Sequence, residues 1–158
     1  MPIENLTPDI RNAVRAVIVR NDQVLLLKKA GGISGERFAL PGGGQNLGET
    51  LAQALKRECL EEIGSTIEIV ALMNVADHFK PRETDPPSTR HLVEFLFRCI
   101  VPDDYVAHNG IKPDKSQLDV VWKNLADLAA IPLYPESLSH WLSRGIPGDT
   151  VVYLGTME

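Results

Sequence analysis

The chain has 158 residues, of which 44% are hydrophobic and 23% are charged, and its formal net charge at pH 7 is −5. This length and apolar content indicate one domain, residues 1–158, that can bury roughly 70% of the surface of its unfolded chain. The negative charge argues against broad nucleic-acid binding, although a small anionic substrate stays compatible with it.

The first twenty residues and the two cysteines indicate the cellular compartment. Residues 1–20 contain charged side chains and no long apolar run, which argues against a signal peptide and a membrane span. Cys59 and Cys99 are far apart in sequence, and each lies in an apolar pattern typical of a buried free thiol. We therefore expect a cytoplasmic protein. Its oligomeric state stays open, a homodimer included.

The first third of the chain predicts strands. Apolar and β-branched residues indicate strands over 12–19 and 24–28, joined by a turn at Asn21-Asp22, and a short strand over 38–40. The Pro-Gly-Gly-Gly segment 41–44 is predicted to be a loop, because glycine is poorly suited to the interior of a helix or strand.

A helix is predicted next. Thr50 and Gln53 have the spacing of a capping box, good helix formers continue to Ile63, and Gly64 is a natural stop. Its apolar residues recur at every fourth position and predict one buried stripe: Leu51, Leu55, Cys59 and Ile63. The charged residues Arg57, Glu58, Glu61 and Glu62 fall largely outside that stripe, so we expect an acidic surface beside the glycine loop.

The remainder predicts more of the sheet and two short helices. Strands are expected over 66–76, 91–101, 119–123 and 151–154, and helices over 125–130 and 135–144. The segment 77–90 is predicted to be a long irregular loop, of the kind that often carries function. Mixed strands with few helices indicate an α+β fold with helices packed against a mixed sheet. In strand 91–101, Glu94 is interpreted as a surface acid paired with Arg98 rather than as a site residue.

The glutamates of the predicted helix break two local rules. Glutamates three and four positions apart repel each other by roughly 0.2–0.5 kcal/mol per pair, and anions in a last helical turn oppose the helix dipole by roughly 0.3–1 kcal/mol each. A bound cation would remove both penalties. Because the ligands would be carboxylates without a neighbouring Cys and His pair, a hard ion such as Mg²⁺ or Mn²⁺ is favoured over zinc.

The segment from Gly43 to Ser65 resembles the signature of the Nudix hydrolases. The match in identity and spacing covers Gly43, Glu49, Arg57, Glu58, Glu61, Glu62 and Gly64. Cys59 and Ser65 stand where the family usually has aliphatic residues, and Ser65 is the real departure, affecting the packing after the helix. The resemblance implies the Nudix fold, an α/β/α sandwich with a mixed sheet, over about residues 11–145.

The resemblance also implies roles for these residues. Glu58, Glu61 and Glu62 would be metal ligands, and Arg57 would pair with Glu49 to hold the loop against the helix. Gly42 and Gly43 would let the backbone approach the phosphates. The general base stays open between Glu58 and three acids outside the signature: Glu83, Asp114 and Asp119.

The expected activity is metal-dependent hydrolysis of a nucleoside diphosphate linked to another group. ADP-ribose or a nucleotide sugar is favoured as substrate, and a nucleoside triphosphate comes next. Phe38 or Phe79 could stack on a base, and Lys80, Arg82 or Arg90 could reach the distal phosphate or ribose. The main alternative is a nucleotide-binding sensor on the same fold without chemistry, and an isomerase of a small diphosphate is a further one.

Overall fold

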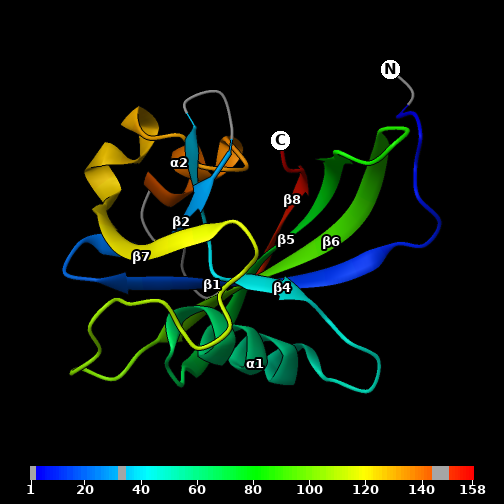
Figure 1. Cartoon of the computed structure of the whole chain (residues 1–158). Coiled ribbons are helices and arrows are strands. Elements are labelled where there is room, and N and C mark those ends of the chain that lie inside the picture. The colour runs from blue at the N-terminus through cyan, green and yellow to red at the C-terminus, as the bar shows by residue number, and fades with distance from the viewer. Residues whose placement is uncertain (1–2, 32–34, 144–149) are drawn as a thin grey trace.

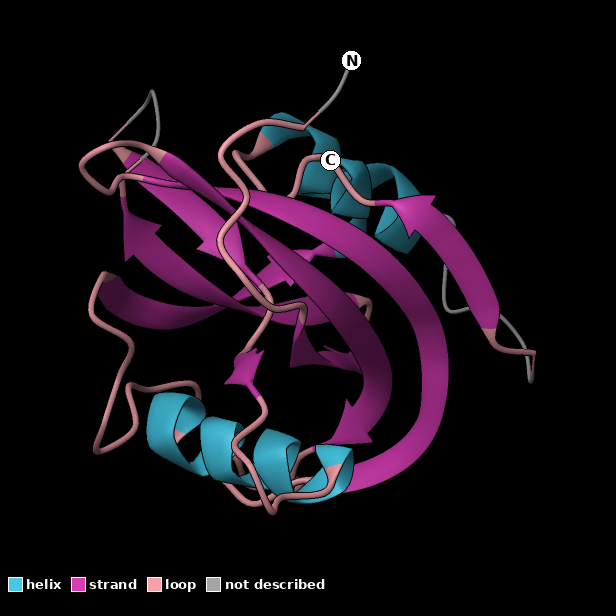
Figure 2. Cartoon of the chain, turned by 90° about the vertical axis from the view of Figure 1, so that its right-hand side faces the viewer, coloured by secondary structure: helices cyan, strands magenta, loops and turns pink. Residues whose placement is uncertain are grey.

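The computed structural model describes residues 3–31, 35–143 and 150–158. Helix α1 (Leu51–Ile63) lies on one side of a β-sheet layer, and helix α2 (Ser137–Ser143) with the 3₁₀ helix η1 (Leu125–Ala130) lies on the other (Figure 1 and Figure 2). The strands are β1 (Arg11–Arg20), β2 (Gln23–Ala30), β3 (Glu36–Ala39), β4 (Gly42–Gly44), β5 (Glu68–Arg82), β6 (Ser88–Ile100), β7 (Gln117–Asn124) and β8 (Val152–Thr156). The predicted α+β class and α/β/α sandwich are confirmed.

The sheet is mixed, and β1 lies at its centre. The strand order is β3-β2-β1-β6-β5-β8, with β4 also paired to β1 and β7 paired to β2. Strands β1 and β6 are parallel, whereas β5 and β6 form a long antiparallel hairpin, which Figure 1 shows as a curved green ribbon. Because helices cover both sides, β1 is almost entirely apolar from Ala13 to Ile18, apart from Arg15.

Two cores flank the sheet. On the α1 side, Leu55, Cys59 and Ile63 pack with alternate residues of β1 such as Val14 and Ile18. The other core contains Val17, Leu26, Leu96, Leu138 and Leu142, from β1, β2, β6 and α2. Cys59 and Cys99 are buried free thiols, as predicted. Within the described ranges, no helix is both long and apolar enough to cross a membrane.

The predicted loop over 77–90 is wrong. Strand β5 continues to Arg82 and pairs with β6 from its first residue, Ser88, so only residues 83–87 connect the two strands. The sequence did not indicate these strand ends, because their residues are mostly polar and include Pro81. The charged residues Lys80, Arg82 and Arg90 therefore lie on paired strands of the β5–β6 hairpin.

The predicted glycine loop is also wrong. Gly42–Gly44 forms β4, which pairs antiparallel with β1 from Ala13 to Arg15. Glycine is required here by close approach, because a β carbon on Gly42, whose φ is +145°, would lie 1.9 Å from the carbonyl oxygen of Val14. A strand without side chains thus occupies the space between β1 and α1.

The other predicted elements are present with boundaries shifted by a few residues. The last helix begins at Ser137 rather than residue 135, and its predicted end at Arg144 lies outside the described residues. Trp122 and Trp141 are partly buried and pack against the two cores.

Candidate active site

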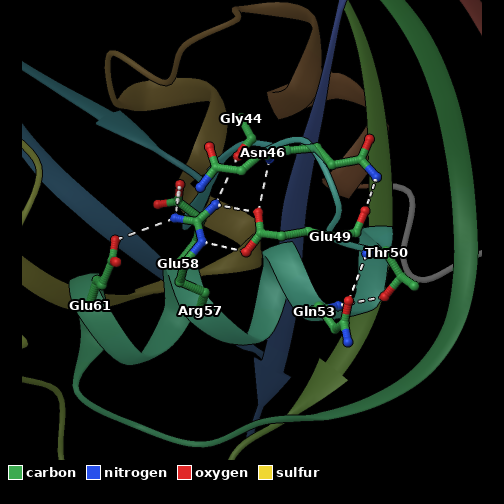
Figure 3. Close-up of polar contacts among 9 residues, drawn as sticks. Gly44, Asn46, Glu49, Thr50, Gln53, Arg57, Glu58 and Glu61 are labelled. Atoms are coloured by element: carbon green, nitrogen blue, oxygen red, sulfur yellow. Dashed lines mark hydrogen bonds and ion pairs between the residues drawn. The ribbon is translucent and has the colours of Figure 1, made fainter.

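Helix α1 begins and ends where the sequence predicts. The Thr50 hydroxyl accepts a hydrogen bond from Gln53 N at 3.1 Å, and Gln53 Oε1 accepts one from Thr50 N at 2.8 Å (Figure 3). Gly64 ends the helix in the left-handed conformation with φ of +67°. The buried stripe through Leu55, Cys59 and Ile63 fixes the rotation of the helix, so Glu58 comes to lie under β4.

Arg57 organises the signature residues. Its guanidinium donates Nε to Glu49 Oε2 at 2.7 Å and Nη2 to Glu49 Oε1 at 3.0 Å, the two-pronged geometry that only arginine provides. Nη2 also donates to the Gly44 carbonyl at 3.0 Å, and Nη1 donates to Glu58 Oε1 at 3.0 Å (Figure 3). The bond to Glu49 is the largest cause of a raised Arg57 pKa. Arg57 therefore connects β4, the loop before α1 and the helix. The predicted pair of Arg57 with Glu49 is present.

Glu62 does not lie on an exposed acidic surface, contrary to prediction. Its side chain is 4% exposed, and its Oε1 accepts a hydrogen bond from Gly42 N at 2.8 Å. Burial raises the pKa of Glu62 to about 8, and the charge of Glu58 acts in the same direction. Burial also raises the pKa of Glu58, with a smaller contribution from Glu61. The negative charges on this face of α1 are thus crowded and poorly solvated.

Glu58 sits directly against the backbone of β4. A β carbon on Gly43 would lie 2.4 Å from Glu58 Oε1 and 2.6 Å from Glu58 Cδ. Gly43 is therefore required less by its own conformation than by the space that the carboxylate occupies. Strand β4 and Arg57 together fix Glu58 at the floor of the site.

The chemistry of these side chains fits a hard divalent cation. Glu58, Glu61 and Glu62 share one helix face through spacings of three and four residues, and they offer only carboxylate oxygens. Among the described residues, no three acidic, histidine or cysteine side chains already enclose a metal position. Mg²⁺ needs only one or two carboxylates and completes its shell with water and substrate phosphate, so an open arrangement suits it.

A cleft of about 370 Å³ opens above Glu58 and Glu62. Its floor includes β4, and its walls come from β1, β2 and the ends of β5 and β6. Six cationic side chains line it: Arg11, Arg15, Lys29, Lys80, Arg82 and Arg90. Three acids line it as well, namely Glu58, Glu62 and Asp114. Anionic oxygens of a ligand in this cleft could thus meet cationic side chains as well as a metal ion held by the carboxylates.

A family model described as the NUDIX domain matches residues 9–144. The chain belongs to the Nudix hydrolase family.

Two relatives illustrate the range of Nudix proteins that resemble this chain. The nucleoside triphosphatase NudI of Enterobacter sp. (strain 638) is 28% identical over 142 residues, which cover 86% of this chain and 97% of that protein. The ADP-ribose pyrophosphatase of Methanocaldococcus jannaschii is 32% identical over 85 residues, 54% of this chain and 47% of that protein. The crystal structure of a MutT NUDIX hydrolase from Burkholderia pseudomallei has a TM-score of 0.64 at 24% identity and covers 83% of this chain and 95% of that one, a likeness of fold.

Some of the remaining predicted site residues line the cleft above Glu58 and Glu62. Arg82 lines it together with Lys80 and Arg90. Of the three acids outside the signature, only Asp114 lines the cleft, and its carboxylate pairs with Lys29 Nζ at 2.5 Å. Glu83 and Asp119 are exposed outside the cleft lining, and Asp119 Oδ1 accepts a hydrogen bond from Val120 N at 2.8 Å.

The proposed stacking role of Phe38 is wrong. Its side chain is 6% exposed and belongs to the core on the α2 side, with Lys123 Nζ 5.1 Å from its ring centroid. Alternation along β3 turns this ring inward, away from the cleft. Phe79 stacks on His91 with ring centroids 4.4 Å apart, so that face of its ring is already covered.

Glu94 is buried in the structure and is not the surface acid that the sequence predicts. It is 2% exposed and does not pair with Arg98; its Oε1 accepts a hydrogen bond from Arg15 Nη2 at 3.1 Å and lies 3.4 Å from His78 Nδ1. His78 Nε2 in turn lies 3.2 Å from the Tyr134 hydroxyl. Arg15 and Glu94 lie on parallel neighbouring strands that are far apart in sequence, so nothing local indicated the pair.

Arg11, Arg15 and Lys29 were also missed as cleft residues. The available signal was the arginine at position 15 within the otherwise apolar residues 13–19, since a charge at a buried strand position requires a partner or a ligand. Alternate residues of a strand share one face, and Arg11, Ala13 and Arg15 on β1 all line the cleft.

Proposed function

We propose that this Nudix hydrolase cleaves the diphosphate linkage of a nucleoside diphosphate joined to another group, with Mg²⁺ or Mn²⁺ as the required ion. The observation that carries the proposal is the cleft itself. Crowded carboxylates of α1 lie beneath a strand of glycines, and a set of cationic side chains lines the same cleft. Such a surface suits a substrate that is anionic and is bound together with a cation.

The names of the relatives support two substrate classes. The relative that is similar over most of its length is called a nucleoside triphosphatase, and the one similar over about half its length is called an ADP-ribose pyrophosphatase. Both classes contain a phosphoanhydride next to a nucleoside. We therefore keep ADP-ribose, nucleotide sugars and nucleoside triphosphates as the candidate substrates.

In this proposal Glu58, Glu61 and Glu62 would hold the metal ion, which would neutralise phosphate charge and lower the pKa of a water molecule bound to it. Arg57 keeps Glu58 in place through its bonds to Glu49 and Gly44. Gly43 allows substrate and carboxylate to come close to the backbone of β4. Lys80 and Arg15 line the same cleft and contribute positive charge to it.

The attacking water also has to lose a proton to a base. Glu58 and Asp114 both line the cleft and are the two candidates. Replacing each separately by its amide, as Glu58→Gln and Asp114→Asn, distinguishes them. The variant that lacks the base should lose the rise of kcat with pH that the other variant retains.

The proposal is tested by Glu61→Gln and Glu62→Gln, assayed for nucleotide release with Mg²⁺. We expect kcat/KM to fall by more than about 100-fold in each, because even residues outside the ligand shell of a metal cost about 10–100-fold. Lys56→Gln, an exposed change on the same helix, is the control and should keep its activity. Full activity of both glutamine variants would contradict the metal site. Nucleotide binding without any product over hours would instead favour a sensor.

A further inference from the structure

The six cationic side chains of the cleft differ in whether they have an acidic partner. Arg15 pairs with Glu94, and Lys29 pairs with Asp114. By contrast, within the described ranges Arg11, Arg82 and Arg90 make no ion pair or side-chain hydrogen bond. These three arginines, called here the outer arginines, therefore carry positive charge that the protein itself does not neutralise.

Strand register gathers the outer arginines at one end of the sheet. Arg90 lies directly opposite Lys80 in the β5–β6 hairpin, and Arg82 is opposite Ser88, two residues before Arg90. Arg11 is opposite Leu92, two residues after Arg90. Because side chains two apart on a strand share a face, the three arginines and Lys80 project from the same face of the sheet. Directly opposed like charges destabilise a strand pair, so this arrangement favours an anionic ligand.

Two further observations connect the outer arginines to the site. Arg11 Nη2 would lie 3.1 Å from a β carbon on Gly44, so its guanidinium reaches the glycine strand. Burial lowers the pKa of Arg90, and the charges of Arg82 and Arg11 lower it further, in agreement with the strand register that brings the three side chains together. The acids of the cleft do not relieve this repulsion, since Glu58, Glu62 and Asp114 already bond to Arg57, Gly42 and Lys29.

We propose that the outer arginines form a second anion subsite, which holds a phosphoryl group beyond the diphosphate at the carboxylates of α1. This inference rests on the proposed function and narrows it. A nucleoside triphosphate can place one phosphate on the outer arginines while its other phosphates reach the metal ligands, whereas ADP-ribose presents a neutral sugar there. The subsite thus favours nucleotides with three or more linked phosphates.

The test compares ATP with ADP-ribose, which share a base, in the wild type and in Arg82→Gln, Arg90→Gln and the double variant. We expect the ratio of kcat/KM for ATP to that for ADP-ribose to fall by about 10- to 100-fold in the double variant, the range for loss of a charged hydrogen bond. Arg98→Gln removes an arginine from the same strand outside the cleft and should leave the ratio unchanged. An unchanged ratio in the double variant overturns the subsite, as does a wild type that cleaves ADP-ribose and leaves ATP intact.

Equilibrium binding of inorganic tripolyphosphate and pyrophosphate separates this inference from the proposed function, because it requires no turnover. The wild type should bind tripolyphosphate more tightly than pyrophosphate, and the double variant should lose that preference. If no nucleotide is hydrolysed while the tripolyphosphate preference is present and depends on the arginines, the proposed function fails and the subsite stands. Equal binding of the two anions by the wild type overturns the subsite.

Discussion

Substituting Gly43 by alanine tests the position of Glu58 without altering any charged group. The added β carbon would lie 2.4 Å from Glu58 Oε1, about 1 Å closer than an ordinary van der Waals contact of 3.4 Å. The carboxylate is the end of a flexible side chain, so it should retreat by about 1 Å while the fold persists. A displacement of that size at a catalytic group can reduce the rate by about 100-fold. We therefore expect kcat/KM of Gly43→Ala to fall by about two orders of magnitude.

The assay is steady-state nucleotide release at saturating Mg²⁺, with the melting temperature measured on the same samples. Gly43→Ala should melt within a few degrees of the wild type. Gly42→Ala is the contrasting variant, because its β carbon would lie 1.9 Å from the Val14 carbonyl oxygen and its φ is +145°. Backbone strain alone should lower the free energy of unfolding of Gly42→Ala by about 1–3 kcal/mol. Wild-type activity in a folded Gly43→Ala protein would refute the placement of Glu58 in the reaction.

Three further changes test the surroundings. Arg57→Lys keeps the charge but loses the two-pronged contact with Glu49, so kcat/KM should fall about 10- to 100-fold; an unchanged value in steady-state kinetics would argue against the positioning role. Burial raises the pKa of Glu62 to about 8, so this carboxyl costs stability that grows as the pH rises from about 4.5 toward 8. Glu62→Gln removes that cost while its amide oxygen can still accept from Gly42 N, so in chelator at pH 8 the inactive variant should melt above the wild type, and a lower melting temperature would contradict this. For Glu94, burial opposes the charged form, but Arg15 and His78 prevail and lower the pKa from 4.5 to about 2. Ionised Glu94 therefore stabilises the folded protein fully above about pH 4.5, and this stabilisation is lost as the pH falls through about 2. Glu94→Gln should cost about 3–5 kcal/mol in urea unfolding at pH 7, and the difference should shrink toward pH 2; the same difference at both pH values would refute the linkage.

The signature helix could be predicted almost completely because its information is local. The capping box at Thr50, the stop at Gly64 and the apolar residues at every fourth position each depend on residues that are close in sequence. The pairing of Arg57 with Glu49 followed from the resemblance to the Nudix hydrolases and is present. Helical spacing could not foresee that Glu62 would be covered, because its cover is β4, which itself was predicted as a loop.

The errors share one physical origin, namely pairing between distant strands. The glycines of β4 read as a loop in isolation, and they become a strand only because β1 offers a partner and leaves no room for a β carbon. The polar ends of β5 and β6 read as a loop because they line a site instead of a core. Glu94 was assigned the local neighbour Arg98, whereas its partner Arg15 comes from the adjacent parallel strand.

The most direct test of the account is product release from a panel of ADP-ribose, nucleotide sugars, dinucleoside polyphosphates and nucleoside triphosphates, each with Mg²⁺, with Mn²⁺ and with chelator. We expect cleavage of at least one class with the metal ion and none with chelator, and strongest activity on substrates with three or more linked phosphates. Cleavage that persists in chelator, or nucleotide binding without product across the whole panel, would contradict a metal-dependent hydrolase.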